Sequence, residues 1–139
     1  MDRISEAERS KNMKRIRSTN TQPEKIVRSF LHKNGFRFRL NCTKLPGKPD
    51  IVLHKYSTVI FVHGCFWHQH KNCKNARQPK SNQEYWRPKL QRNVERDKEV
   101  KRKLKKIGWK VIIIWECNTK KLDYLVKVIS QNRILLHKN

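Results

Sequence analysis

The chain has 139 residues, of which 34 are Lys or Arg and 11 are Asp or Glu, so its formal net charge is +23 at pH 7. A chain of this length fits one domain that buries roughly two thirds of its unfolded surface. Such a charge destabilises the compact chain by self-repulsion, which a phosphate backbone relieves by binding Lys and Arg. The composition argues against an ordinary enzyme of small neutral substrates and favours nucleic acid, over anionic membrane, as the partner.

Hydropathy and cysteine usage bear on the compartment. No apolar run approaches the roughly 18 to 20 residues of a spanning helix, and the first residues lack the apolar stretch of a signal peptide. We therefore expect a cytoplasmic protein with no membrane partner. Four Cys residues in a reducing compartment are expected to be thiols or metal ligands rather than disulfides.

The first half of the chain predicts a basic arm, a helix and a meander. Residues 1–20 carry few apolar side chains and are expected to form a mobile basic arm, with a frayed terminus as the alternative, while 21–139 form one domain. Thr21-Gln-Pro-Glu24 has the spacing of a capping box and predicts a helix from about 22 to 34. Apolar and alternating runs then predict antiparallel strands at 36–40, 50–54 and 58–63.

The second half predicts a functional loop and a crossover. Residues 64–88 are rich in His, Cys, Trp and basic side chains, and an irregular segment of that length is usually functional. A long helix carrying Leu90 to Ile107 is expected next, ended by Gly108. A strand at 110–115 and a helix around 122–129 follow. Because this strand can pair in parallel with a meander strand, the predicted fold class is α/β or α+β, with a mixed sheet flanked by helices.

Cysteine and histidine spacing predicts a metal site. Cys65-x4-His70-x2-Cys73 places three ligands within nine residues, and Cys117 directly follows the strand predicted at 110–115. Three Cys and one His make the closed tetrahedral set that is typical of structural zinc. Scattered buried thiols are the alternative. Cys42 is left over as a buried or loop residue.

One carboxylate and two histidines are candidates for catalysis. Asp50 begins a predicted strand directly after a Pro-Gly turn, where it can hold magnesium against a phosphate or merely close the turn. His63 and His68 flank Cys65 and suit general acid or base work, although surface histidines or a spare zinc ligand fit equally well. The role of Glu24 is open, because its place in the capping box already explains it.

Large aromatic residues stand within the basic segments. Phe66-Trp67 and Tyr85-Trp86 are surrounded by Lys, Arg, Asn, Gln and His. Aromatic rings presented in this way suit stacking on bases or wedging between them, and packing in the core is the alternative. Trp109 and Trp115 are assigned to the core because they lie on the predicted strand or at its edge.

Five segments together carry a resemblance to one family: Arg9–Met13, Leu45–Asp50, Val59–His68, Asn93–Asp97 and Gly108–Cys117. They are similar to the bacterial very-short-patch repair endonucleases, Vsr, almost from end to end. The string HGCFWH, followed by further His and Cys residues at metal-ligand spacing, is the most specific part of the match.

The resemblance implies a fold similar to type II restriction endonucleases and a magnesium-dependent nicking activity. The bond cut would lie 5′ of the thymine in a T:G mismatch that arises when 5-methylcytosine is deaminated. By this resemblance Asp50 and the backbone carbonyl of Val62 bind magnesium, and His68 is the general base or proton carrier, with Glu24 and His63 supporting it. Position 62 is Val where the best-known members have Thr, a change that a carbonyl ligand survives.

The same resemblance implies a zinc site, a wedge and a set of partners. The structural zinc ligands would be Cys65, His70, Cys73 and Cys117. The residues that intercalate beside the mismatch would be Phe66, Trp67 and Trp86. The arm at 1–20 would close around double-stranded DNA that carries a T:G mismatch, a MutL-type mismatch-repair protein is a candidate partner, and a monomer suits an asymmetric mismatch.

Three other readings of the sequence stay open. A restriction-like nickase with another mismatch or site specificity would use the same residues on a different substrate. A zinc-stabilised DNA-binding module without catalysis would need neither magnesium nor Asp50. An RNA-binding protein would suit the charge and the aromatics, and it would prefer single-stranded loops.

Overall fold

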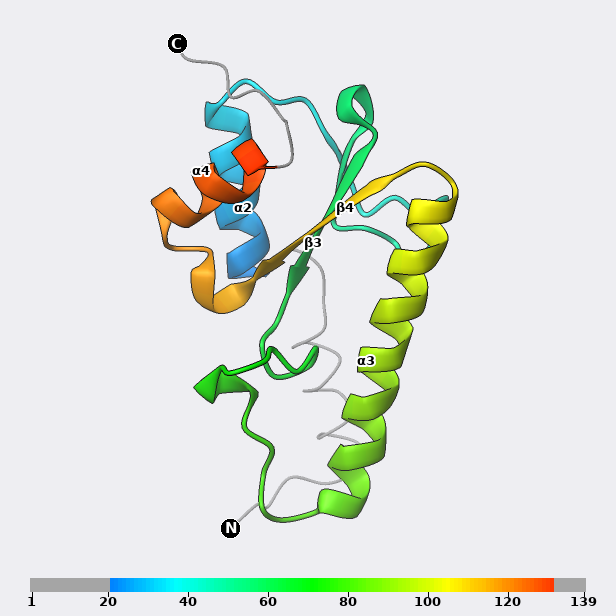
Figure 1. The fold of residues 1–139 in the computed structure, drawn as a ribbon. Helices are drawn as coiled ribbons and strands as arrows, with labels where there is room; N and C mark the ends of the chain where they lie inside the picture. The colour runs from blue at the N-terminus through cyan, green and yellow to red at the C-terminus, as the bar shows by residue number, and fades with distance from the viewer. Residues whose placement is uncertain (1–20, 132–139) are drawn as a thin grey trace.

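The structure, a computed structural model, describes residues 21–131, which contain three α-helices and four strands joined by loops and short 3-10 helices (Figure 1). The arm predicted at 1–20 lies outside the described residues. The elements are α2 (Gln22–Lys33), β1 (Arg39–Leu40), β2 (Ile51–Leu53), β3 (Thr58–His63), α3 (Gln83–Lys106), β4 (Lys110–Trp115) and α4 (Leu122–Gln131).

The four strands form one mixed sheet in the order β1-β2-β3-β4. The first three pair antiparallel, and β4 pairs parallel with β3 after the crossover through α3. Residues 58–63 of β3 face residues 110–115 of β4 in register, so the segments that follow these two strands begin side by side. The predicted α/β class, with a mixed sheet flanked by helices, is confirmed.

Helices cover both faces of the sheet, as Figure 1 shows, with α2 and α4 together on one side and α3 on the other. Successive side chains of a strand point to opposite faces, so Ile51 and Leu53 pack with α2 and α4 while Val52 packs toward α3. Each of these fully buried apolar side chains contributes about 1.5 to 3 kcal/mol. Among residues 21–131, no helix is both long and apolar enough to cross a membrane.

The start of α2 follows the predicted pattern. The Thr21 side chain accepts a hydrogen bond from the backbone N–H of Glu24 at 3.4 Å, and a proline occupies the first turn. The helix ends before Asn34, and Gly35 follows with φ of 80°. The capped end holds the Glu24 side chain at a fixed place, where it is buried.

Two predicted boundaries are wrong. Only Arg39–Leu40 of the strand expected at 36–40 pairs, because after β2 the chain turns through a short 3-10 helix, His54–Tyr56, instead of extending the ladder. The long helix begins at Gln83, so the irregular segment ends at residue 82 rather than 88. Its first two turns hold no aliphatic side chain and include Pro88, which disfavours a helix interior, so the hydrophobic spacing marked only the later turns.

Candidate active site

The three cysteines and one histidine predicted to bind zinc lie together. Their ligand atoms, from Cys65, His70, Cys73 and Cys117, all lie within 4.8 Å of one another. His70 Nδ1 is 3.7 Å from Cys65 Sγ and 3.5 Å from Cys117 Sγ. The parallel pairing of β3 and β4 explains this, because Cys65 and Cys117 each follow the end of one of the paired strands by two residues.

The chemistry of this cluster fits a zinc ion. Cys65 is fully buried, and burial raises the pKa of its thiol to about 12. A backbone hydrogen bond at Asn75 holds the pKa of Cys73 below its ordinary value. Zinc takes four thiolate and imidazole donors in a closed tetrahedron and keeps bound thiols deprotonated. The cluster could therefore hold zinc and tie the loop after β3 to the end of β4.

Asp50, the residue before β2, is held by a backbone hydrogen bond from the neighbouring strand. Its Oδ2 accepts a hydrogen bond from the backbone N–H of Val62 in β3 at 2.7 Å. Burial raises the pKa of Asp50 to about 6, against the lowering effect of that hydrogen bond, and the nearby Glu24 charge raises it further. Half-buried next to a second acid, the Asp50 carboxylate would gain from a cation.

Glu24 lies beside Asp50 but already has a cation. Its Oε2 accepts a hydrogen bond from Arg28 Nη2 at 3.1 Å, one turn further along α2. Both acids line a cavity of about 550 Å³ that also holds His63, His68 and Asp97. The structure thus brings all four predicted catalytic side chains to one hollow.

The two histidines stack face to face. The ring centroids of His63 and His68 are 3.7 Å apart, with 6° between the planes. Burial, followed by the neighbouring His68, lowers the pKa of His63 to about 3, so this ring is neutral at neutral pH. Among the described residues, its buried Nδ1 has no hydrogen-bond partner. His68 therefore stacks on a neutral imidazole ring.

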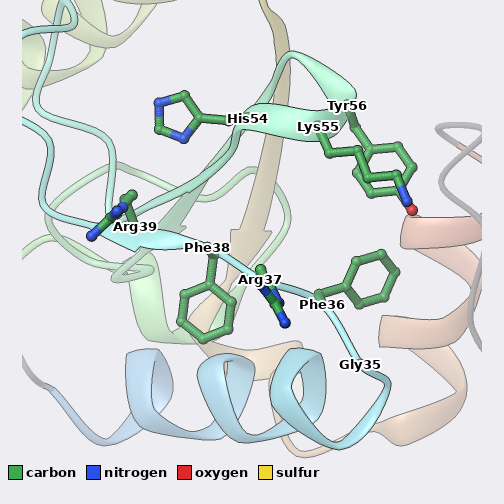
Figure 2. A pocket seen from close by; sticks show the side chains of 8 residues that line it. All are labelled: Gly35, Phe36, Arg37, Phe38, Arg39, His54, Lys55 and Tyr56. Carbon is green, nitrogen blue, oxygen red and sulfur yellow. The ribbon is translucent and has the colours of Figure 1, made fainter.

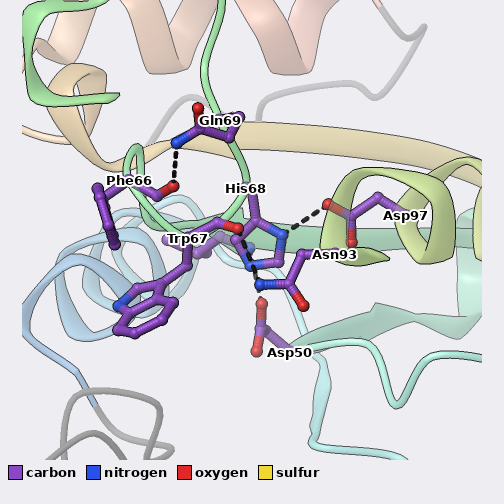
Figure 3. Close-up of polar contacts among 8 residues, drawn as sticks. Asp50, Phe66, Trp67, His68, Gln69, Asn93 and Asp97 are labelled. Atoms are coloured by element: carbon purple, nitrogen blue, oxygen red, sulfur yellow. Dashed lines mark hydrogen bonds and ion pairs between the residues drawn. The ribbon is translucent and has the colours of Figure 1, made fainter. Parts of the chain in front are cut away.

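His68 is oriented by Asp97, a residue that the sequence did not mark as a candidate for the site. Its Nδ1 lies 2.7 Å from Oδ2 of Asp97, which projects from α3 (Figure 3). One turn earlier on the same helix face, the Asn93 side chain donates to the Trp67 carbonyl at 3.1 Å. The spacing of 93 and 97 by four residues within a helix could have indicated a shared face. Their partners could not have been predicted from it.

The loop between β3 and α3 is fastened by a second residue missed from the sequence. Gln69, with φ of 50°, donates from Nε2 to the carbonyls of Phe66 at 2.6 Å and Ala76 at 3.1 Å, and its Oε1 accepts from Gln78 at 3.1 Å. These bonds join the aromatic part of the loop to the segment after Cys73. Nothing in the sequence marked Gln69 for this role.

The three aromatics predicted to intercalate pack against one another. Phe66 lies edge to face with Trp67 and with Trp86 at centroid distances of 5.2 and 5.3 Å, and the two indoles are 5.8 Å apart. Lys89 Nζ lies 5.7 Å from the Trp67 ring. Trp86 stands in the first turn of α3 rather than in a loop, and all three rings are half-buried. Phe66 and Trp67 also line the cavity that holds the two acids and the two histidines, which we call the catalytic cavity after its predicted role.

The two tryptophans assigned to the core differ. Trp109 packs against the apolar cluster under α3 and contacts His54 edge to face. Trp115 is half-buried, and its ring stacks on His70 at 4.2 Å and lies edge to face with His63 at 5.3 Å. Trp115 therefore connects the cysteine cluster to the histidine stack. Cys42 is half-buried beside the cluster under α3.

Comparison with known proteins places the chain in a family. The family model described as DNA mismatch endonuclease Vsr matches residues 1–75. The chain is 49% identical over 119 residues, 86% of this chain, to a protein of Neisseria meningitidis named type II nicking enzyme V.NmeAIP, of which 84% is covered. It is 47% identical over 89% of its length to type II nicking enzyme V.XorIIP of Xanthomonas oryzae, of which 90% is covered. DNA mismatch endonuclease Vsr of Escherichia coli is 45% identical over 80% of this chain and 70% of its own length. The chain therefore belongs to the Vsr family of DNA nicking endonucleases.

Proposed function

We propose that this enzyme nicks one strand of duplex DNA on the 5′ side of the thymine in a T:G mismatch, with magnesium as its catalytic cofactor and zinc as a structural one. The observation that carries the proposal is the catalytic cavity. It joins a carboxylate of raised pKa, a carboxylate-oriented histidine and an aromatic cluster within one hollow.

Oxygen donors in the cavity suit magnesium. Asp50 would bind it through its carboxylate, and Val62 through its backbone carbonyl, on the strand whose N–H already fixes the Asp50 side chain. When bound, magnesium supplies positive charge that neutralises the scissile phosphate. The raised pKa of Asp50 supports this assignment, because a buried anion without a cation is costly.

His68 is placed to move a proton. Its Nδ1 is engaged by Asp97, which leaves Nε2 as the ring nitrogen that can accept a proton from water. As the water oxygen bonds to phosphorus, its proton passes to Nε2 and Asp97 stabilises the imidazolium. The P–O bond to the leaving sugar oxygen breaks, and that oxygen takes up a proton from solvent. The neutral His63 ring keeps the His68 plane fixed by stacking.

The aromatic cluster supports recognition of a mismatch. Unstacking a base pair costs a few kcal/mol, and less where the pair is already mismatched. Phe66 and Trp67 lie on a loop that Gln69 and Asn93 fasten, and Trp86 on α3 packs against both rings, so the three form one cluster beside the cavity. Because these rings lie close to the catalytic groups, their insertion beside a mismatched base pair would bring the neighbouring phosphodiester bond to the catalytic cavity.

The names of two relatives favour one alternative. Both are called type II nicking enzymes, which favours a nickase that uses the same residues on another mismatch or site. The basic segment at 74–84 would then contribute to the choice of flanking bases.

The test is strand-specific cleavage. An end-labelled duplex with one T:G mismatch is incubated with the enzyme in magnesium, beside a T:A duplex and the Asp50→Ala variant. A nick only 5′ of the mismatched T, lost in the variant and without magnesium, supports the proposal. Equal cutting of the T:A duplex would point to a restriction-like nickase, and binding without any cutting to a DNA-binding module.

A further inference from the structure

A second cavity, of about 770 Å³, lies away from the catalytic one. It opens between the segment 35–39 and the short 3-10 helix His54–Tyr56, at the end of β2 remote from Asp50 (Figure 2). Its volume is in the range of about 300 to 1,000 Å³ that is usual for ligand pockets. No role proposed above uses it.

The cavity exists because a strand ladder stops early. β1 pairs with β2 only at Arg39 and Leu40. Residues 36–38, which precede β1, therefore have no strand beside them, because the chain turns into the 3-10 helix directly after Leu53. The alternation of that segment is kept: Phe36 is buried in the apolar core, Phe38 packs against the core but is only half-buried, and Arg37 and Arg39 are exposed. The divergence leaves a hollow with aromatic rings and cations on its walls.

The lining has the composition of a nucleic-acid site. Of the eight described residues that line it, four are basic, namely Arg37, Arg39, His54 and Lys55, all of them exposed, and none is acidic. Phe38 and Tyr56 are half-buried, and Lys55 Nζ lies 5.8 Å from the Tyr56 ring centre. Phe36 supports Tyr56 from the core side by an edge contact at 5.8 Å.

We propose that this cavity binds an unpaired stretch of DNA strand. Cations that follow a backbone, together with rings on which bases stack, are the two elements of single-strand binding. A duplex has no free base faces to offer the rings, and an acidic peptide would need the cations but not the rings. The proposal does not depend on mismatch specificity, because binding here involves none of the catalytic residues.

The proposal is tested by fluorescence anisotropy with labelled deoxythymidine decamer, without magnesium. Two variants remove the two elements separately. The cation variant carries three changes, Arg37→Gln, Arg39→Gln and Lys55→Gln. The ring variant carries two, Phe38→Leu and Tyr56→Leu. The matched control removes three exposed lysines elsewhere, Lys120, Lys121 and Lys127, by substitution with Gln. Thermal unfolding checks that each variant is folded, and the cation variant changes only exposed side chains.

We expect both cavity variants to bind the decamer at least tenfold more weakly than the control, with nicking of a mismatched duplex retained. The cation variant should also reduce the slope of log K against log salt by about 2, as three lost phosphate contacts on a single strand imply. Binding within twofold of the control by both variants would overturn the proposal. So would a cavity-dependent preference for oligouridine or for an acidic peptide over the DNA decamer.

Discussion

The His68 imidazole and the Asp97 carboxylate, 29 residues apart in the chain, lie 2.7 Å from each other between Nδ1 and Oδ2. This pair fixes which ring nitrogen of His68 faces the protein and which, in the proposed mechanism, accepts a proton from water. An amide in place of the carboxylate cannot stabilise an imidazolium in the same way.

We therefore expect Asp97→Asn to lower the single-turnover nicking rate by roughly 10- to 100-fold, less than the roughly 10²- to 10⁴-fold that a general acid or base itself contributes, because Asp97 acts through His68. The affinity for uncut mismatched duplex, measured without magnesium, should stay the same. Glu99→Gln is the matched control, because Glu99 lies on the same helix but pairs with the exposed Arg102. Equal rates for Asp97→Asn and the control would remove Asp97 from the mechanism.

The cysteine cluster makes a prediction about metal content. Cys117→Ser should abolish stoichiometric zinc and lower the melting temperature, because the loss of one ligand opens the tetrahedron that joins the loop to the end of β4. Cys42→Ser should keep one zinc per chain, since Cys42 is not part of the cluster. Metal analysis of both purified variants, with thermal unfolding, checks this. Zinc retained by Cys117→Ser would contradict the assignment.

Asp50 makes a prediction about stability and pH. Its folded pKa of about 6 lies above its ordinary 3.8, so the stability it contributes is fully present below pH 3.8 and is lost as pH rises through 6. In magnesium-free buffer, Asp50→Asn should therefore be more stable than the natural chain at pH 8 by about 2 to 3 kcal/mol, and by roughly half as much at pH 5.

Urea unfolding at the two pH values, with zinc kept in the buffer, measures this difference. Added magnesium should stabilise the natural chain at pH 8 and leave the variant unchanged. The gain in free energy of unfolding of the variant over the natural chain should be larger at pH 8 than at pH 5. A smaller gain at pH 8 would show that the Asp50 carboxylate already has a compensating cation.

Much of this architecture could be predicted from local patterns. Apolar spacing and the capping box were enough for α2, β3 and β4, and the ligand spacing was enough for the cysteine cluster. The start of α3 was missed because Gln83 to Lys89 carry no aliphatic side chain and include Pro88, which disfavours a helix interior. β1 was overestimated because alternation predicts a strand but not whether a partner continues beside it.

The catalytic cavity was predictable only in part. Asp50, His63 and His68 stand near turns and strand ends, where the sequence marks them. The contacts that orient them come from residues distant in sequence, such as Asp97 and the backbone of Val62. Pairings of this kind are set by how α3 lies against the sheet, and no local pattern encodes that. The family resemblance supplied the roles, and the structure supplied their partners.

Gly47 makes the final prediction, because its turn carries Asp50 to the cavity. Its φ is +74°, and a Cβ placed there would lie 2.3 Å from Val100 Cγ1 on α3. Gly108 also has positive φ, +95°, but a Cβ there would meet nothing within 4 Å. Left-handed strain costs roughly 1 to 2 kcal/mol at either site, and the clash adds about 1 to 3 kcal/mol at Gly47 alone.

Gly47→Ala should therefore destabilise the protein by about 2 to 5 kcal/mol, and Gly108→Ala by about 1 to 2 kcal/mol, in urea unfolding. Adding Val100→Ala should recover part of the loss at Gly47, because the smaller side chain makes room for the new methyl group. The double-mutant cycle then gives a favourable coupling of about 1 kcal/mol or more. Additive losses would mean that the turn moves away from α3, and nicking should then fall with it, since Asp50 lies three residues further along.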